Sequence, residues 1–218
     1  SAYKYTGGVK YDPFVTTTLE ARRSGGMSRS VYHGSGTAAY LGHNGFVSNA
    51  VAYQNKFGPA SVWVTYSPDE SQNQDGEYTA ALKFGDKSWE AFVSAAGSGG
   101  DTATGAVDYT ATKVGGQFKA GDHKISAQYE MTSFTGDNGG DDDVDILFVG
   151  YQLKFLDKNV FVAQLGQEDP QVSDGTDYFA IGVIHKLNKK SRIFGGYAST
   201  DKDSAETTHL SVGLRVDI

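Results

Sequence analysis

Apolar and polar residues alternate along most of the chain, and the alternation is clearest at its end. Between Thr208 and Ile218 every second residue is apolar, and the residues between are small or charged. The side chains of a β-strand point alternately to opposite faces, so this stretch predicts a strand with one apolar and one polar face. The pattern recurs from residue 47 onward, although over 159–167 it does not show which residues share a face. It predicts eleven strands, near residues 47–57, 60–67, 77–84, 88–96, 109–119, 123–133, 144–155, 159–167, 177–187, 191–199 and 206–218.

The predicted connections alternate between short turns and long loops. The long loops hold most of the 26 acidic residues and only one of the 19 basic residues, Lys202. Aromatic residues border both kinds of connection, as interfacial girdles would. These features are typical of a transmembrane antiparallel up-and-down β-barrel, and we predict that all-β fold, as a single domain over residues 1–218. A soluble β-sandwich is the alternative. The bordering residues are Phe57, Phe84, Phe118 and Phe155 beside short turns, and Tyr66, Tyr78, Tyr109, Tyr178 and Tyr197 beside long loops.

The first 46 residues do not follow the alternation. Asp12 and Pro13 favour the start of a helix that runs to about Arg23. Residues 24–46 are rich in Gly and Ser, and a long irregular stretch inside a compact fold is usually functional. We expect 1–46 to form the end of a preceding strand and a loop, and 47–218 to form the barrel strands. Since eleven strands leave an edge unpaired, either residues 2–11 form a twelfth strand that closes the barrel, or further strands precede this chain.

Composition argues against several other functions. The chain has no Cys, so it offers neither disulfides nor thiolate metal ligands. A net charge of −7 argues against nucleic acid as a partner. The five His residues lack metal-ligand spacing, and we expect neither an enzyme nor a cofactor. One acidic run could hold calcium, although it lacks the Gly and terminal Glu of an EF-hand, and a solvated loop is the alternative. Its candidate ligands are Asp141, Asp143 and Asp145.

The closing residues 181–218, IGVIHKLNKKSRIFGGYASTDKDSAETTHLSVGLRVDI, resemble the last strands of the general porins of Gram-negative outer membranes. That resemblance implies a trimeric, 16-stranded barrel in the outer membrane, with a long loop after the fifth strand that folds inward and narrows the channel. The eleven strands predicted here follow such a loop, so the chain corresponds to the C-terminal two-thirds of that barrel. An external flap is the alternative for the loop. The charged residues of the expected constriction loop are Asp12, Glu20, Arg22, Arg23 and Arg29.

The resemblance also implies a function. We expect a water-filled channel for passive diffusion of ions and small hydrophilic solutes, in contact with membrane lipid and lipopolysaccharide. Acids outnumber bases away from the short turns, which favours a weak preference for cations. A non-conducting barrel that serves as a surface receptor or adhesion protein is the alternative. The residues expected to line the pore are Glu90, Gln128, Glu130, Gln152 and Arg215.

Overall fold

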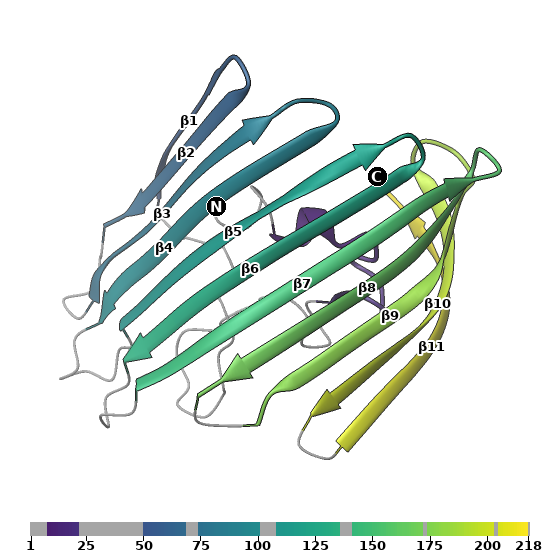
Figure 1. Ribbon diagram of the computed structural model, residues 1–218. Helices are drawn as coiled ribbons and strands as arrows, with labels where there is room; N and C mark the ends of the chain where they lie inside the picture. Colours follow the sequence, from purple (N-terminus) through teal and green to yellow (C-terminus); the bar gives the residue numbers. More distant parts are fainter. Residues whose placement is uncertain are drawn as a thin grey trace.

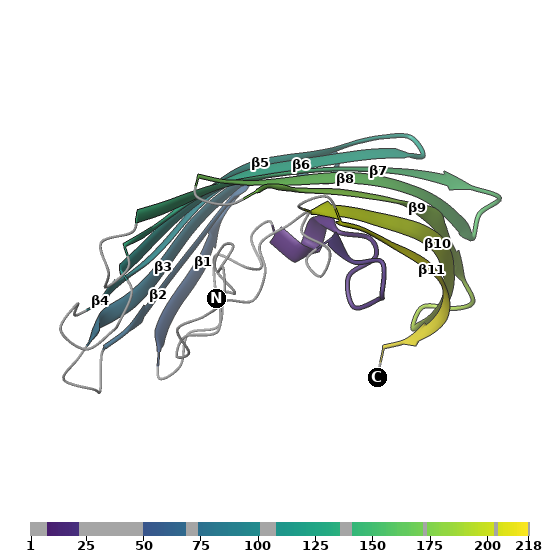
Figure 2. The ribbon, with the colours of Figure 1, turned by 90° about the horizontal axis from the view of Figure 1, so that it is seen from below.

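The computed structural model is an open, curved antiparallel sheet with a short segment on its concave face (Figures 1 and 2). It describes residues 8–21, 50–68, 74–100, 108–135, 141–171, 174–202 and 205–217. None of the helices among them is long and apolar enough to span a membrane. After a 3-10 helix η1 (Gly8–Tyr11), the strands are β1 (Val51–Phe57), β2 (Ala60–Ser67), β3 (Gln74–Gly85), β4 (Trp89–Gly100), β5 (Asp108–Ala120), β6 (His123–Thr135), β7 (Asp141–Phe155), β8 (Asn159–Pro170), β9 (Thr176–Lys186), β10 (Ser191–Lys202) and β11 (Ala205–Val216).

All eleven predicted strands are confirmed, and each pairs with its neighbours in sequence order. Within the described residues β1 and β11 do not pair with each other, so the sheet is not closed. The short turns need tight backbone geometry. Gly58 and Gly121 both have φ near 58°, a left-handed conformation that glycine adopts without a steric penalty. The alternative of a twelfth strand is not met over residues 8–11, which form η1, and residues 1–7 lie outside the described part.

The convex face of the sheet is apolar and exposed. Leu210 and Val212 of β11 are 86% and 80% exposed, and exposed apolar side chains project from each of the strands β1 to β10 as well. A sandwich would bury such a face against a second sheet, whereas a barrel in a bilayer turns it toward lipid. The aromatic residues beside the short turns lie on this face, as do Tyr66, Tyr78 and Tyr197. Tyr178 departs from the expected girdle, because it points to the concave face and is buried.

Residues 8–21, which we call the docked segment, lie on the concave face (Figure 2). The expected helix from Asp12 is wrong over residues 13–20, which form consecutive turns. The Asp12 carboxylate explains the difference, because it accepts hydrogen bonds from the backbone N–H of Phe14 and of Ala21, both at 2.8 Å. Such side-chain bonds offer the backbone an alternative to a helix and close the segment on itself.

Candidate functional site

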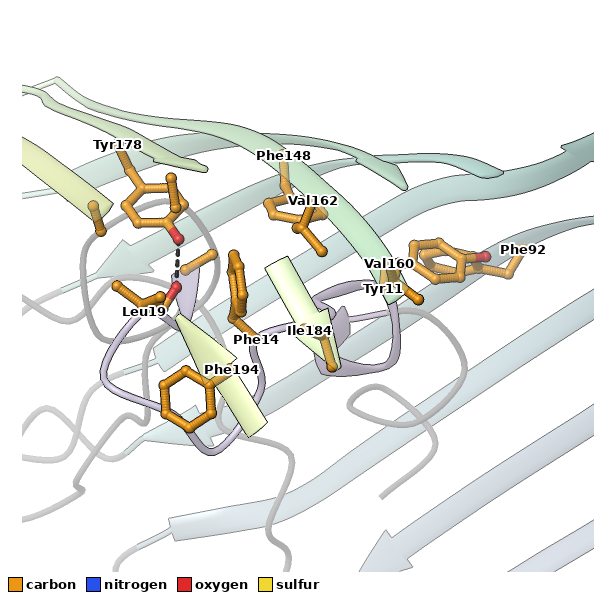
Figure 3. Packing of buried hydrophobic residues seen from close by; sticks show 13 residues of the cluster. Tyr11, Phe14, Leu19, Phe92, Phe148, Val160, Val162, Tyr178, Ile184 and Phe194 are labelled. Atoms are coloured by element: carbon orange, nitrogen blue, oxygen red, sulfur yellow. Dashed lines mark hydrogen bonds between the residues drawn. The ribbon is translucent and has the colours of Figure 1, made fainter. Parts of the chain in front are cut away.

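The docked segment is held by an apolar cluster that it shares with the sheet. Phe14 and Leu19 are fully buried, together with inward residues of β4 and β7 to β10 (Figure 3). Two facing glycines give them room: a Cβ on Gly182 of β9 would lie 2.9 Å from the Phe14 ring, and one on Gly196 of β10 would lie 2.9 Å from Leu19. The inward aromatic residues Phe92 and Phe148 are therefore covered rather than open to water.

Polar contacts fix both ends of the docked segment. At one end Lys10 pairs with Glu90 of β4, whose carboxylate also accepts a bond from Tyr11 Oη at 3.2 Å. The Tyr11 ring packs edge-on against Phe92 at 5.7 Å. At the other end Thr18 Oγ1 donates to Ser211 Oγ of β11 at 2.5 Å. The segment thus crosses the concave face from β4 to β11.

Further hydrogen bonds tie the middle of the segment to the sheet. Tyr178 Oη donates to the Leu19 carbonyl at 2.6 Å (Figure 3). Gln164 Nε2 of β8 donates to the same carbonyl at 3.3 Å. Arg215 Nη1 of β11 donates to the Val15 carbonyl at 2.5 Å. These contacts were not predicted from the sequence, since nothing in it shows which strand residues meet the segment.

The expected constriction residues take different positions. Asp12 and Glu20 are both buried and bonded within the segment, where Glu20 Oε2 accepts from the Thr16 N–H at 2.6 Å. Neither carboxylate faces open solvent. Arg22, Arg23 and Arg29 lie outside the described residues.

The expected pore-lining residues all lie on the concave face. Glu90 is bonded to the segment, and Arg215 is half-exposed. Gln152 is half-buried and sits opposite Lys124 of the neighbouring strand. Gln128 and Glu130 are buried, so they do not meet an open space. Glu130 is paired with Lys113 of β5 at 3.2 Å.

The expected calcium ligands fall at the start of β7. Asp143 and Asp145 are exposed on the convex face, and the side chain of Asp141 is outside the described part. Gln171 Nε2 donates to Asp143 Oδ2 at 3.1 Å. Across the described residues no three acidic or His side chains are grouped so that they could hold a metal ion.

An apolar convex face, a polar and partly covered concave face, and a segment folded against the concave face are the features of part of a membrane β-barrel wall. The family comparison agrees with that class. A family model described as "Gram-negative porin" matches residues 2–205, and the chain belongs to this family. Its location is accordingly the outer membrane.

Solved structures share the fold at low sequence identity. An anion-selective porin from Comamonas acidovorans matches with a TM-score of 0.67 and 18% identity, over 78% of this chain and 58% of that one. The outer-membrane protein OmpT of Vibrio cholerae matches with a TM-score of 0.65 and 15% identity, over 78% and 66%. A porin refined at 1.8 Å matches with a TM-score of 0.65 and 16% identity, over 82% and 66%. The chain thus spans less than two-thirds of the length of these proteins. No curated protein matches it.

Protonation of Asp12 should strengthen docking of the segment. Burial raises the pKa of Asp12 from 3.8 to about 7, opposed by its bonds to the Ala21 and Phe14 N–H groups and to Gln164, while the Glu20 charge adds to the rise. Because the undocked carboxyl loses its proton first, docking should weaken as pH rises from 3.8 to about 7 and change little above that value. We expect hydrogen-exchange protection of the segment's amides, corrected for intrinsic rates, to fall across this window.

An Asp12→Asn variant provides the control for that pH dependence. It keeps an acceptor for one N–H group but cannot ionise, so the fall in protection across the window should disappear. A fall of equal size in the Asn variant would assign the effect to another group.

A charge on the convex face should oppose insertion into a bilayer. Val114 lies near the middle of β5, on the convex face, and is 41% exposed. The Val114→Arg change should cost about 2–4 kcal/mol of folding free energy in lipid, as charges near the midplane do. The measurement is reversible unfolding by denaturant in lipid vesicles. Gln117→Arg is the matched control, because Gln117 is on the concave face of the same strand beside Glu90. Equal costs for the two variants would contradict the assignment of faces.

Proposed function

We propose that the protein containing this chain is a diffusion channel for ions and small hydrophilic solutes. The observation that carries the proposal is the docked segment. A stretch of irregular backbone lies on the polar side of a sheet whose other side is apolar, and non-helical backbone at membrane depth is tolerated where it is buried in protein or lines a water-filled cavity. In that position the segment takes up part of the cross-section, so it would limit the size of the solutes that pass.

The partners of the protein are proposed from its family and from the two faces of the sheet. We propose a homotrimer, as the family resemblance implies, with the convex face in contact with lipid and the loop end near lipopolysaccharide. Calcium at Asp141, Asp143 and Asp145 stays a prediction. The weak preference for cations receives no support from the described concave side chains.

A non-conducting receptor barrel is the second candidate. Several concave polar side chains are buried, so water in the interior does not reach them, which is the condition expected of an occluded interior. These side chains are Thr79, Ser94, Gln128 and Thr132.

Recordings from the full-length protein in planar bilayers separate the two candidates. A diffusion channel should give steady single-channel steps whose size follows the conductivity of the bathing electrolyte, and a trimer should close in three steps. Natively folded protein that inserts but conducts no current would contradict the channel and favour the receptor barrel.

A further inference from the structure

The concave face is strongly basic where the strands meet the short turns. Strand after strand places a cation at this level and on this face, and we call the set the cationic row. The docked segment adds Lys10 beside it. The row consists of Lys56 on β1, Lys83 on β3, Lys119 on β5, Lys124 on β6, Lys154 on β7, Lys186 on β9, Arg192 on β10 and Arg215 on β11.

Members of the cationic row face one another directly across the strands. Lys119 is the register partner of Lys124. Lys186 is the partner of Arg192, which in turn is the partner of Arg215. Like charges placed opposite each other destabilise a sheet. Lys124 also lies within the electrostatic reach of Lys10 and Lys154, and the opposite charge that reaches it among the described residues is that of Glu90. Negative charge close to the cationic row is therefore required to offset this repulsion.

The described carboxylates at this level pair with only three members of the row, one on β3 and two on β10 and β11. Glu90 pairs with Lys10, and its other oxygen lies 3.7 Å from Lys83 Nζ. Asp217 accepts from Arg192 at 2.9 Å and from Arg215 at 2.8 Å. For the four lysines between them, no carboxylate among the described residues lies within ion-pair distance. Three of these lysines are exposed and one is half-buried, so mobile ions can reach them: Lys119, Lys124, Lys154 and Lys186.

The acidic residues at the opposite end do not offset the row, because most of those described face away from the interior. They project from the convex face of β7 to β10. Of the concave acids at that end, Glu130 is paired with Lys113, Glu168 is buried, and Glu77 of β3 is half-buried. Counting acids along the sequence without assigning faces therefore overstates the negative charge of the interior. The convex acids on these strands are Asp143, Asp145, Asp169, Asp177 and Asp201, and Glu206 of β11 lies on the same face.

We propose that the cationic row makes the channel selective for small anions, with Lys119 and Lys124 as the principal pair that an anion contacts. The inference rests on the proposed diffusion channel and specifies what it passes. Rings of Lys and Arg select anions in pores, as rings of acids select cations. Low-dielectric walls focus the field of such a row into the water beside it and raise the local anion concentration. An anion that passes through the pore supplies the negative charge that no described carboxylate places beside these lysines.

The test is the zero-current potential of the full-length protein in a planar bilayer across a KCl gradient at low ionic strength. The zero-current potential of the native channel should have the sign expected when chloride is more permeant than potassium. The Lys119→Gln/Lys124→Gln variant should shift the permeability ratio toward potassium, by roughly two-fold per charge removed before screening. The matched control is Lys87→Gln/Lys189→Gln, which removes two exposed lysines of the short turns and should leave the potential close to native.

The outcomes separate this inference from the proposed function. A native potential with the potassium sign, or a Lys119/Lys124 variant that behaves like the control, overturns anion selectivity while the diffusion channel stands. Native protein that conducts nothing overturns both. Inorganic phosphate provides a second readout that needs no variant: added to the native channel, it should lower the chloride current, and an unchanged current would argue against a contact site at the row.

Discussion

Replacing Phe14 and Leu19 together with alanine is expected to raise the single-channel conductance and the current noise. Both side chains are fully buried between the docked segment and the sheet. Removing such side chains costs about 3–5 kcal/mol for Phe and about 2–5 kcal/mol for Leu. The two residues are close in the chain, so the costs need not add. The segment should therefore leave the wall part of the time and open the cross-section that it occupies.

Phe179→Ala is the matched control for that experiment. Phe179 lies on the convex face of β9, one strand position from the buried cluster, and is 37% exposed. Its loss should leave the conductance unchanged. The Phe14/Leu19 variant should also keep its β-sheet fold, because the strands pair without the segment. A conductance equal to native in that variant would show that the segment does not limit the pore.

Breaking the buried ion pair between β5 and β6 should strongly lower the stability of the sheet itself. Lys113 and Glu130 are 2% and 0% exposed and lie 3.2 Å apart. A Lys113→Met change leaves a buried carboxylate without its cation, which costs about 3–5 kcal/mol. The measurement is the temperature at which the folded form is lost, followed by heat-dependent gel migration, and we expect a clear decrease.

Two further variants assign that decrease to the pair. Adding Glu130→Leu to Lys113→Met removes both charges and should restore most of the stability, because an apolar replacement of similar volume is often neutral. Lys119→Met changes an exposed lysine of the same strand and should cost little. A Lys113 variant as stable as the Lys119 variant would contradict the account of the pair.

The strands and their faces could be predicted from the sequence because each strand carries its own two-residue period. The exception was β8, and the structure shows why. Val160 and Val162 point to the concave face, where polar residues are expected, because the apolar cluster under the docked segment needs them there. The outward residues Phe161 and Leu165 are apolar too, so both faces look alike. The faces that the β8 side chains take are therefore explained by the docked segment, which lies more than a hundred residues earlier in the chain.

The path of the docked segment could not be predicted for the same reason. The contacts of Leu19 with Tyr178 and of Val15 with Arg215 join parts of the chain that only the folded barrel brings together. Tyr178 looked like a girdle residue from its place beside a long loop. A sequence signal for the cationic row did exist: lysines recur on the polar phase of strands beside the short turns, Lys119 and Lys124 among them.

The central claim is that the concave face meets water and the convex face meets lipid, and cysteine modification tests it most directly. The chain has no Cys, so each single substitution gives one reactive position. The pair to compare is Gln117→Cys on the concave face and Val114→Cys on the convex face of β5, in protein held in lipid vesicles. A charged thiol reagent that does not cross membranes should modify the Gln117→Cys variant and leave the Val114→Cys variant unmodified. Rapid modification of the Val114→Cys variant, with the Gln117→Cys variant protected, would contradict the account.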